Sequence, residues 1–135
     1  MKTALVSLIG LLASVSAFSQ SKSPNPPNDP PETVIVTYRA KPGSEDALEK
    51  VIRKHWATVR RLKLVTEDVH LLYRGEDEPG KTFFVNVFTW KNHDAPDNAP
   101  PEVEAVWAEM QPLVEARGGH RGIEHPEVKA VPLSD

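Results

Sequence analysis

Runs of β-branched and aromatic residues separated by polar turns predict three strands in the middle of the chain. These runs lie at Thr33 to Arg39, Val69 to Arg74 and Thr82 to Lys91. The second and third are separated by Gly75 to Gly80, a polar stretch that contains two glycines and a proline. The pattern therefore predicts an antiparallel hairpin with a six-residue turn.

Apolar residues at helical spacing predict two helices. The first follows the cap residue Ser44, has acidic residues in its first turn and collects basic residues toward Lys63, which suits the helix dipole. The second follows a loop from Asn92 to Pro100 and begins at Pro101, with a kink or restart at Pro112 and an end at Gly118-Gly119. A last short strand is expected at Glu127 to Val131.

The predicted order is β-α-β-β-α-β, which is typical of a ferredoxin-like α+β sandwich with two helices on one face of a four-stranded sheet. Both faces of the third strand are apolar: Phe83, Val85 and Val87 alternate with residues that include Phe84, Phe88 and Trp90. A sheet face exposed to water would be polar. We therefore expect a second copy of the chain to cover it, giving a homodimer.

The first residues have the order of a secretory signal peptide. Lys2 precedes an unbroken apolar run from Ala4 to Ala13, and small residues end at Ala17. We expect cleavage after Ala17 and a periplasmic or secreted product. The following segment, 18 to 31, holds five of the 13 prolines and predicts a disordered linker. The domain is expected at 32 to 131, with a tail at 132 to 135.

Composition excludes several classes of function. The chain contains no cysteine, so it has no disulfide, thiolate nucleophile, thiolate metal site or lipid-carrying cysteine. Its formal net charge is −3, and removal of Lys2 with the leader makes it more negative. We expect no nucleic-acid partner and no membrane anchor.

The strand and helix motifs resemble a known superfamily. The first strand runs into Ala40-Lys41-Pro42-Gly43, the third reads FFVNVFTW and ends at Trp90, and the second helix carries Trp107 and Met110. Together they resemble the dimeric α+β barrel superfamily, and within it antibiotic biosynthesis monooxygenase-type domains. The likeness covers Glu32 to about Val131.

This resemblance implies two ferredoxin-like subunits joined through their sheets, each with a small-molecule cleft between its sheet and helices. Some members oxidise aromatic substrates with oxygen and no cofactor, and others bind or degrade haem. The haem-degrading members combine an Asn on the first strand, a Trp on the third and a His on the second helix. Only Trp90 matches here, so haem binding is the weakest alternative, with His55 the remaining possible ligand. We expect no cofactor.

His55 is the leading candidate for a catalytic or ligand-orienting group, because it interrupts the apolar stripe of the first helix. A core histidine that is satisfied by a neighbour is the alternative interpretation. We predict a cleft between the first helix and the sheet, with Val51 and Val59 in its apolar wall. The candidate ligand-binding residues are His55, Asn86, Phe88, Trp90, Trp107 and Tyr38.

Other polar residues have no predicted position in the site. The side of the sheet taken by Tyr38, Arg39, His70, Tyr73 and Arg74 depends on strand register. His93, His120 and His125, with Asp94 and Glu124 nearby, offer metal-binding atoms but no recognised spacing, so no metal site is predicted.

Two classes of function follow. One is an exported small-molecule-binding domain that acts as a cofactor-independent monooxygenase on an aromatic or other apolar molecule. The other is a non-catalytic periplasmic binding or dimerisation module. The sequence has no complete catalytic constellation that would decide between them.

Overall fold

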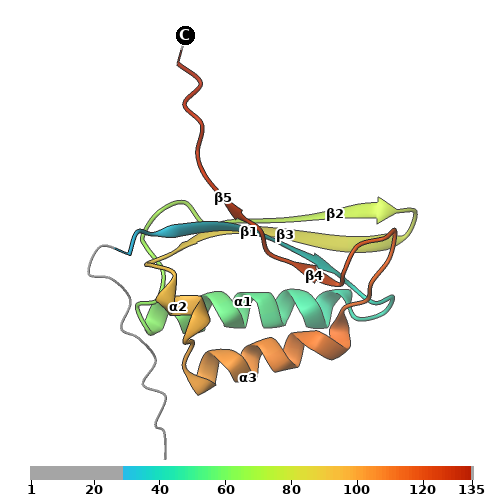
Figure 1. The fold of residues 1–135 in the computed structure, drawn as a ribbon. Coiled ribbons are helices and arrows are strands. Elements are labelled where there is room, and N and C mark those ends of the chain that lie inside the picture. Colours follow the sequence, from blue (N-terminus) through green and yellow to red (C-terminus); the bar gives the residue numbers. More distant parts are fainter. Residues whose placement is uncertain (1–28, 135) are drawn as a thin grey trace, which may run out of the picture.

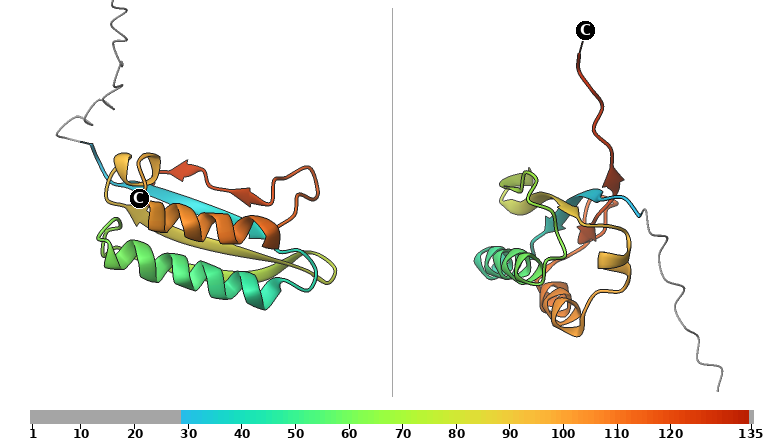
Figure 2. Two further views of the ribbon diagram at one scale, coloured as in Figure 1. Left: turned by 90° about the horizontal axis from the view of Figure 1, so that it is seen from below. Right: turned by 90° about the vertical axis from the view of Figure 1, so that its left-hand side faces the viewer.

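The computed structural model describes residues 29–134, so the predicted signal peptide and most of the predicted linker lie outside the described residues. One sheet forms a layer, and the two longer helices cover one of its faces (Figures 1 and 2). The elements in chain order are β1 (Glu32–Arg39), α1 (Glu45–Arg61), β2 (Leu71–Glu78), β3 (Lys81–Trp90), α2 (Asp94–Asp97), α3 (Pro101–Met110), the 3₁₀ helix η1 (Gln111–Leu113), β4 (Ile123–Glu124) and β5 (Glu127–Val128).

The strands are arranged in the order β2-β3-β1-β4, and β5 also pairs with β1. All of these pairings are antiparallel. The central pair is β1 with β3, which places Val34 opposite Phe88 and Tyr38 opposite Phe84. This order confirms the predicted ferredoxin-like α+β arrangement.

The core lies between the sheet and the helices. Alternate residues of β1 and β3 are buried on this inner face, among them Val36, Phe84 and Phe88. They pack with the buried stripe of α1, which includes Leu48 and Ile52. The alternate buried residues of the strands and the apolar stripe of α1 thus form one layer between the sheet and the helices.

The outer face of the sheet is also largely apolar. The register aligns Leu71 with Val87 and Ile35, and Tyr73 with Val85, on the side opposite the helices. The Tyr73 side chain is 57% exposed. Figure 2 shows both longer helices on the other side of the sheet, so no helix of residues 29–134 covers the outer face.

The hairpin turn differs from the six-residue prediction. β2 continues to Glu78 and β3 begins at Lys81, so only Pro79 and Gly80 connect them, with Gly80 at a φ of 73°. The prediction was wrong because an edge strand tolerates charged side chains that face solvent. Gly75 lies within β2, where a Cβ atom would come within 3.0 Å of the Phe83 ring.

The second long helix ends earlier than predicted. α3 stops at Met110, followed by one 3₁₀ turn, and Val114 is already extended. Backbone bonds from Lys41 N to Leu113 O and from Glu115 N to Arg39 O, both 2.9 Å, tie this segment to the end of β1. The predicted end at Gly118-Gly119 was wrong because Pro112 weakens the helix and pairing with β1 satisfies the backbone that follows.

Two shorter features also differ from prediction. The segment from Asn92 to Pro100, expected to be a loop, contains the one-turn helix α2, and the Asn92 side chain accepts a bond from Ala95 N at 3.0 Å. The last strand, expected at Glu127 to Val131, ends at Val128 as β5, and a separate β4 precedes it at Ile123–Glu124, since Pro126 between them has no N–H to donate.

Arg117 fastens the segment after α3 to the sheet. Its side chain is 5% exposed. The guanidinium donates to Asp77, to Glu115 and to the backbone oxygens of Ala40 and Thr82. Its role is therefore structural.

In residues 29–134 no helix is both long enough and apolar enough to cross a membrane.

Candidate functional site

A cavity of about 660 Å³ lies on the helix side of the sheet. Its floor comes from β1 and β3, α3 forms one wall, and the segment before and within β4 forms another. The apolar lining residues are Val34, Val36, Phe88, Trp90, Trp107, Met110, Val114 and Ile123. The polar residues around them include Tyr38, His55, Glu32, Asp97, Arg121 and His125.

The cavity lies against α3, whereas the sequence predicted a cleft against the first helix. Among the lining residues α1 contributes His55, while Val51 and Val59 do not line the cavity. Val59 is fully buried in the core. The physical reason is that β4 and β5 have two residues each, so the sheet edge beneath α3 is sparsely filled.

His55 is held in one orientation by Trp107. The indole Nε1–H of Trp107 donates to Nε2 of His55 at 3.0 Å. An indole nitrogen can only donate, so Nε2 carries no proton and the neutral ring has its hydrogen on Nδ1. That Nδ1 is buried and has no hydrogen-bond partner among the described residues.

Burial lowers the pKa of His55 to about 4, and the charge of nearby His70 acts in the same direction. The residue is 2% exposed. The imidazole is therefore neutral at pH 7, because its charged form would lose its hydration. In this environment the His55 ring has an N–H donor at Nδ1 and is a weak base.

Tyr38 projects from β1 toward the same space. Burial raises the pKa of Tyr38 to about 12, and the adjacent Asn86 side chain opposes this shift in part. The hydroxyl remains protonated at neutral pH. Tyr38 and His55 thus give the apolar cavity two neutral polar groups.

Asn86 is fully buried in β3, but it does not line the cavity. Its Oδ1 accepts a bond of 2.9 Å from Nε2 of His70. The His70 ring stacks on Trp56 with centroids 3.8 Å apart. Burial lowers the pKa of His70, while the bond to Asn86 acts in the opposite direction. The contact between His70 and Asn86 was not predicted from the sequence. The residue that could have indicated it is Trp56, which follows His55 on α1 and stacks on the His70 ring.

Aromatic rings surround His55 edge to face. The centroid of His55 lies 5.8 Å from that of Phe88 and 6.0 Å from that of Trp90. Trp90 is 6.4 Å from Trp107 in another edge-to-face contact. Such contacts fix ring orientation beyond simple burial. The cavity therefore has a rigid aromatic end.

Of the six candidate ligand-binding residues, Tyr38, His55, Phe88, Trp90 and Trp107 line the cavity, and Asn86 lies behind it. Ligand binding by these residues remains a prediction.

The structure also shows which side of the sheet the other polar residues take. His70 bonds to inner-face Asn86 and Arg74 lies over the Phe84 ring, both toward the helices, whereas Arg39 and Tyr73 belong to the outer face.

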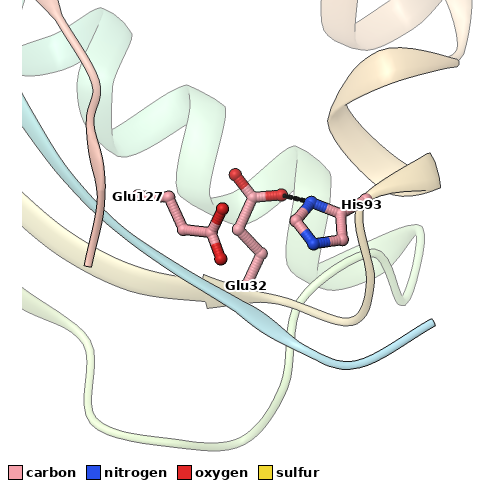
Figure 3. Close-up of side chains that lie close together, drawn as sticks. All are labelled: Glu32, His93 and Glu127. Atoms are coloured by element: carbon pink, nitrogen blue, oxygen red, sulfur yellow. Dashed lines mark ion pairs between the residues drawn. The ribbon is translucent and has the colours of Figure 1, made fainter. Parts of the chain in front are cut away.

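The loop histidines lie in three different settings. His120 contacts Glu124 at 3.3 Å, and Glu124 in turn pairs with Arg39. His125 lines the cavity. Nδ1 of His93 lies 2.6 Å from Glu32, with Glu127 beside them (Figure 3). Glu32 and Glu127 were missed because strand register, not sequence proximity, brings them to His93.

His55 does not fit the haem-ligand alternative. Its Nε2 is engaged by Trp107, and its Nδ1 is shielded from solvent. An axial ligand needs a free ring nitrogen that faces the iron. The structure therefore offers no support for haem ligation by this residue.

No protein-family model matches the sequence. Solved structures are similar in fold. A variant of SnoaB, a cofactor-independent oxygenase from Streptomyces nogalater, aligns with a TM-score of 0.57 and 19% identity over 78% of this chain and 98% of that one. An antibiotic biosynthesis monooxygenase aligns with a TM-score of 0.57 and 19% identity over 75% of this chain and 99% of that one.

A protein of Caulobacter crescentus, provisionally assigned as an antibiotic biosynthesis monooxygenase, gives a TM-score of 0.55 at 21% identity over 76% of this chain and 92% of that one. At these identities the likeness concerns the fold. The chain therefore has the fold of antibiotic biosynthesis monooxygenase domains, as its strand and helix motifs predict.

Proposed function

We propose that this protein binds a mostly apolar small molecule in the cavity beneath α3. The observation that carries the proposal is the cavity itself. Its volume of about 660 Å³ suits a small organic ligand, and its floor and the α3 wall are aliphatic and aromatic, with polar and charged residues such as Glu32, Asp97 and Arg121 around them. Trp90 and Trp107 favour a ligand with a flat ring.

The polar groups narrow the class of ligand. At neutral pH the Tyr38 hydroxyl is protonated, and His55 is neutral with an Nδ1–H that lacks a partner among the described residues. The Tyr38 hydroxyl is suited to donate to a ligand oxygen, and the Nδ1–H of His55 donates to one when the ligand displaces the side chains that cover it. A buried donor without an acceptor costs free energy, so a carbonyl or phenolic oxygen that reached it would be favoured. The proposed ligand is an aromatic molecule with such an oxygen.

Native mass spectrometry of the purified protein, followed by identification of any retained small molecule, is the first test. His55→Leu removes the imidazole and roughly keeps the apolar volume. We expect its affinity for the identified ligand to fall by about 1 to 3 kcal/mol, the range for one buried polar contact. His70→Leu is the matched control, since His70 does not line the cavity. Unchanged affinity in His55→Leu contradicts the role of this residue.

A second candidate function is cofactor-independent oxidation of that ligand by O₂. The observation in its favour is the orientation of His55, whose N–H is suited to stabilise an oxyanion formed on the ligand. His55 is a poor base at a pKa of about 4, so the substrate must itself be acidic. Incubation under ¹⁸O₂ separates the candidates. Mass gain in the ligand supports an oxygenase, and an unchanged ligand supports a binding module.

We further propose that the protein is exported and that the mature form begins at Phe18. The apolar run after Lys2 and the small residues that end at Ala17 support this proposal. The intact mass of protein recovered from the periplasm is the test. Retention of Met1 to Ala17 on that protein would refute it.

A further inference from the structure

We propose that Glu32, His93 and Glu127 bind one divalent transition-metal ion at the edge of the cavity. Each residue has a ligand atom, and these atoms lie within 4.8 Å of one another. Nδ1 of His93 is 2.6 Å from Oε2 of Glu32. Figure 3 shows the two carboxylates and the ring turned toward a common space.

Three segments that are distant in the sequence supply these groups. Glu32 is the first residue of β1, and it pairs with Trp90 at the end of β3. His93 follows shortly after Trp90 and precedes α2. Glu127 lies in β5 opposite Val34, which puts its side chain on the same sheet face as Glu32. The positions of both carboxylates are therefore set by paired strands.

The charge at this point favours a cation. In the described part of the chain, the ion pair of Glu32 is with His93, and Glu127 forms none. Other clustered acids are neutralised by guanidinium groups, since Glu124 pairs with Arg39 and Asp77 with Arg117. The Glu32 side chain is only 15% exposed, so solvent screens it weakly. A divalent ion would remove the repulsion between the two carboxylates.

The donor set indicates the class of metal. One imidazole nitrogen with two carboxylate oxygens suits Zn²⁺ or Mn²⁺, whereas Mg²⁺ and Ca²⁺ favour oxygen ligands alone. Three protein ligands leave coordination positions open. Glu32 also lines the cavity, so an ion held there would lie next to the proposed ligand. No metal site was predicted from the sequence because Glu32 and Glu127 lie far from His93 in the chain.

Isothermal titration of the metal-free protein with ZnCl₂ tests the site, with MgCl₂ as the oxygen-preferring comparison. We expect one Zn²⁺ per chain and much weaker Mg²⁺ binding. Glu127→Gln and His93→Gln should each weaken Zn²⁺ binding by about tenfold or more, since loss of even an outer-shell partner has an effect of this size. His120→Gln is the matched control, because His120 also contacts one carboxylate, Glu124, in a different place.

Glu127 is exposed, so Glu127→Gln should keep the fold, and far-UV circular dichroism checks each variant. Cobalt(II) provides a second readout, since its visible spectrum should change on binding to the wild type and not to His93→Gln. Absence of Zn²⁺ binding at millimolar metal overturns the proposal. Equal Zn²⁺ affinity in the wild type and in both cluster variants overturns it too, as does loss of binding in His120→Gln alone.

Discussion

The Nε1–H of Trp107 donates to Nε2 of His55 over 3.0 Å and thereby fixes the tautomer of a buried imidazole. Trp107→Phe keeps an aromatic ring but leaves His55 Nε2 without its donor. We expect the free energy of unfolding to fall by about 1 to 3 kcal/mol, because a buried acceptor loses its hydrogen bond. Urea denaturation measures this change.

Trp56→Phe is the matched control for that experiment. Trp56 stacks on His70, and a phenyl ring can retain much of that stacking. We expect a smaller loss of stability than in Trp107→Phe. Equal losses in the two variants would mean that the bond to His55 contributes nothing measurable.

The stability of the protein should depend on pH through His55. The unfolded residue protonates near its usual pKa of 6.5, and the folded residue protonates only near 4. Between these values the unfolded state binds more protons, so stability is greatest above about pH 6.5 and decreases as pH falls toward 4. The full contribution is about 3 kcal/mol, from the free energy per unit of pKa shift.

Unfolding free energies of the wild type and His55→Leu, measured at several pH values between 7 and 4, isolate this contribution. The difference between the two proteins should change with pH in that window. The pKa of His70 is also lowered by burial and acts in the same direction, but it is present in both proteins. A difference that stays constant with pH would contradict a buried neutral His55.

The apolar outer face predicts a homodimer. Val87 lies at its centre, between Leu71 and Ile35 in the register. Val87→Glu should convert the dimer to a monomer, because a carboxylate at a sheet-to-sheet contact loses its hydration. Light scattering measures the mass. Ala57→Glu, at an exposed position of α1 away from this face, should remain dimeric. A monomeric wild type would contradict the dimer.

Arg117 should not be replaceable by lysine. Its planar guanidinium reaches Asp77, Ala40 O and Thr82 O at once, and an ammonium group cannot reproduce that geometry. We expect Arg117→Lys to lower the free energy of unfolding by about 2 kcal/mol, since buried backbone oxygens lose their donors. Thermal unfolding measures the change. Arg53→Lys is the control, because Arg53 forms an exposed pair with Glu49; equal shifts would argue against the role of Arg117.

Much of the fold could be predicted from local patterns. The β-branched and aromatic residues of β3 identify it as a strand that is covered on both faces, and the helical spacing of α1 identifies the buried stripe that carries His55. Burial repeats with the period of each element, so an amphipathic segment shows its inner face in its own sequence. Boundaries were less predictable. Composition could not show that charged β2 residues continue the hairpin, or that Val114 pairs with Ala40.

The sequence by itself determined the order of the longer strands and helices, the apolar nature of both sheet faces and most of the aromatic residues around the cavity. Only the tertiary structure decided that Trp107 donates to His55, that Asn86 turns to His70, and that Glu32 and Glu127 meet His93. These contacts join residues far apart in the chain, and their geometry depends on strand register and helix packing. A one-residue change of register would send the side chains of a strand to the opposite face, so no local pattern could have placed them.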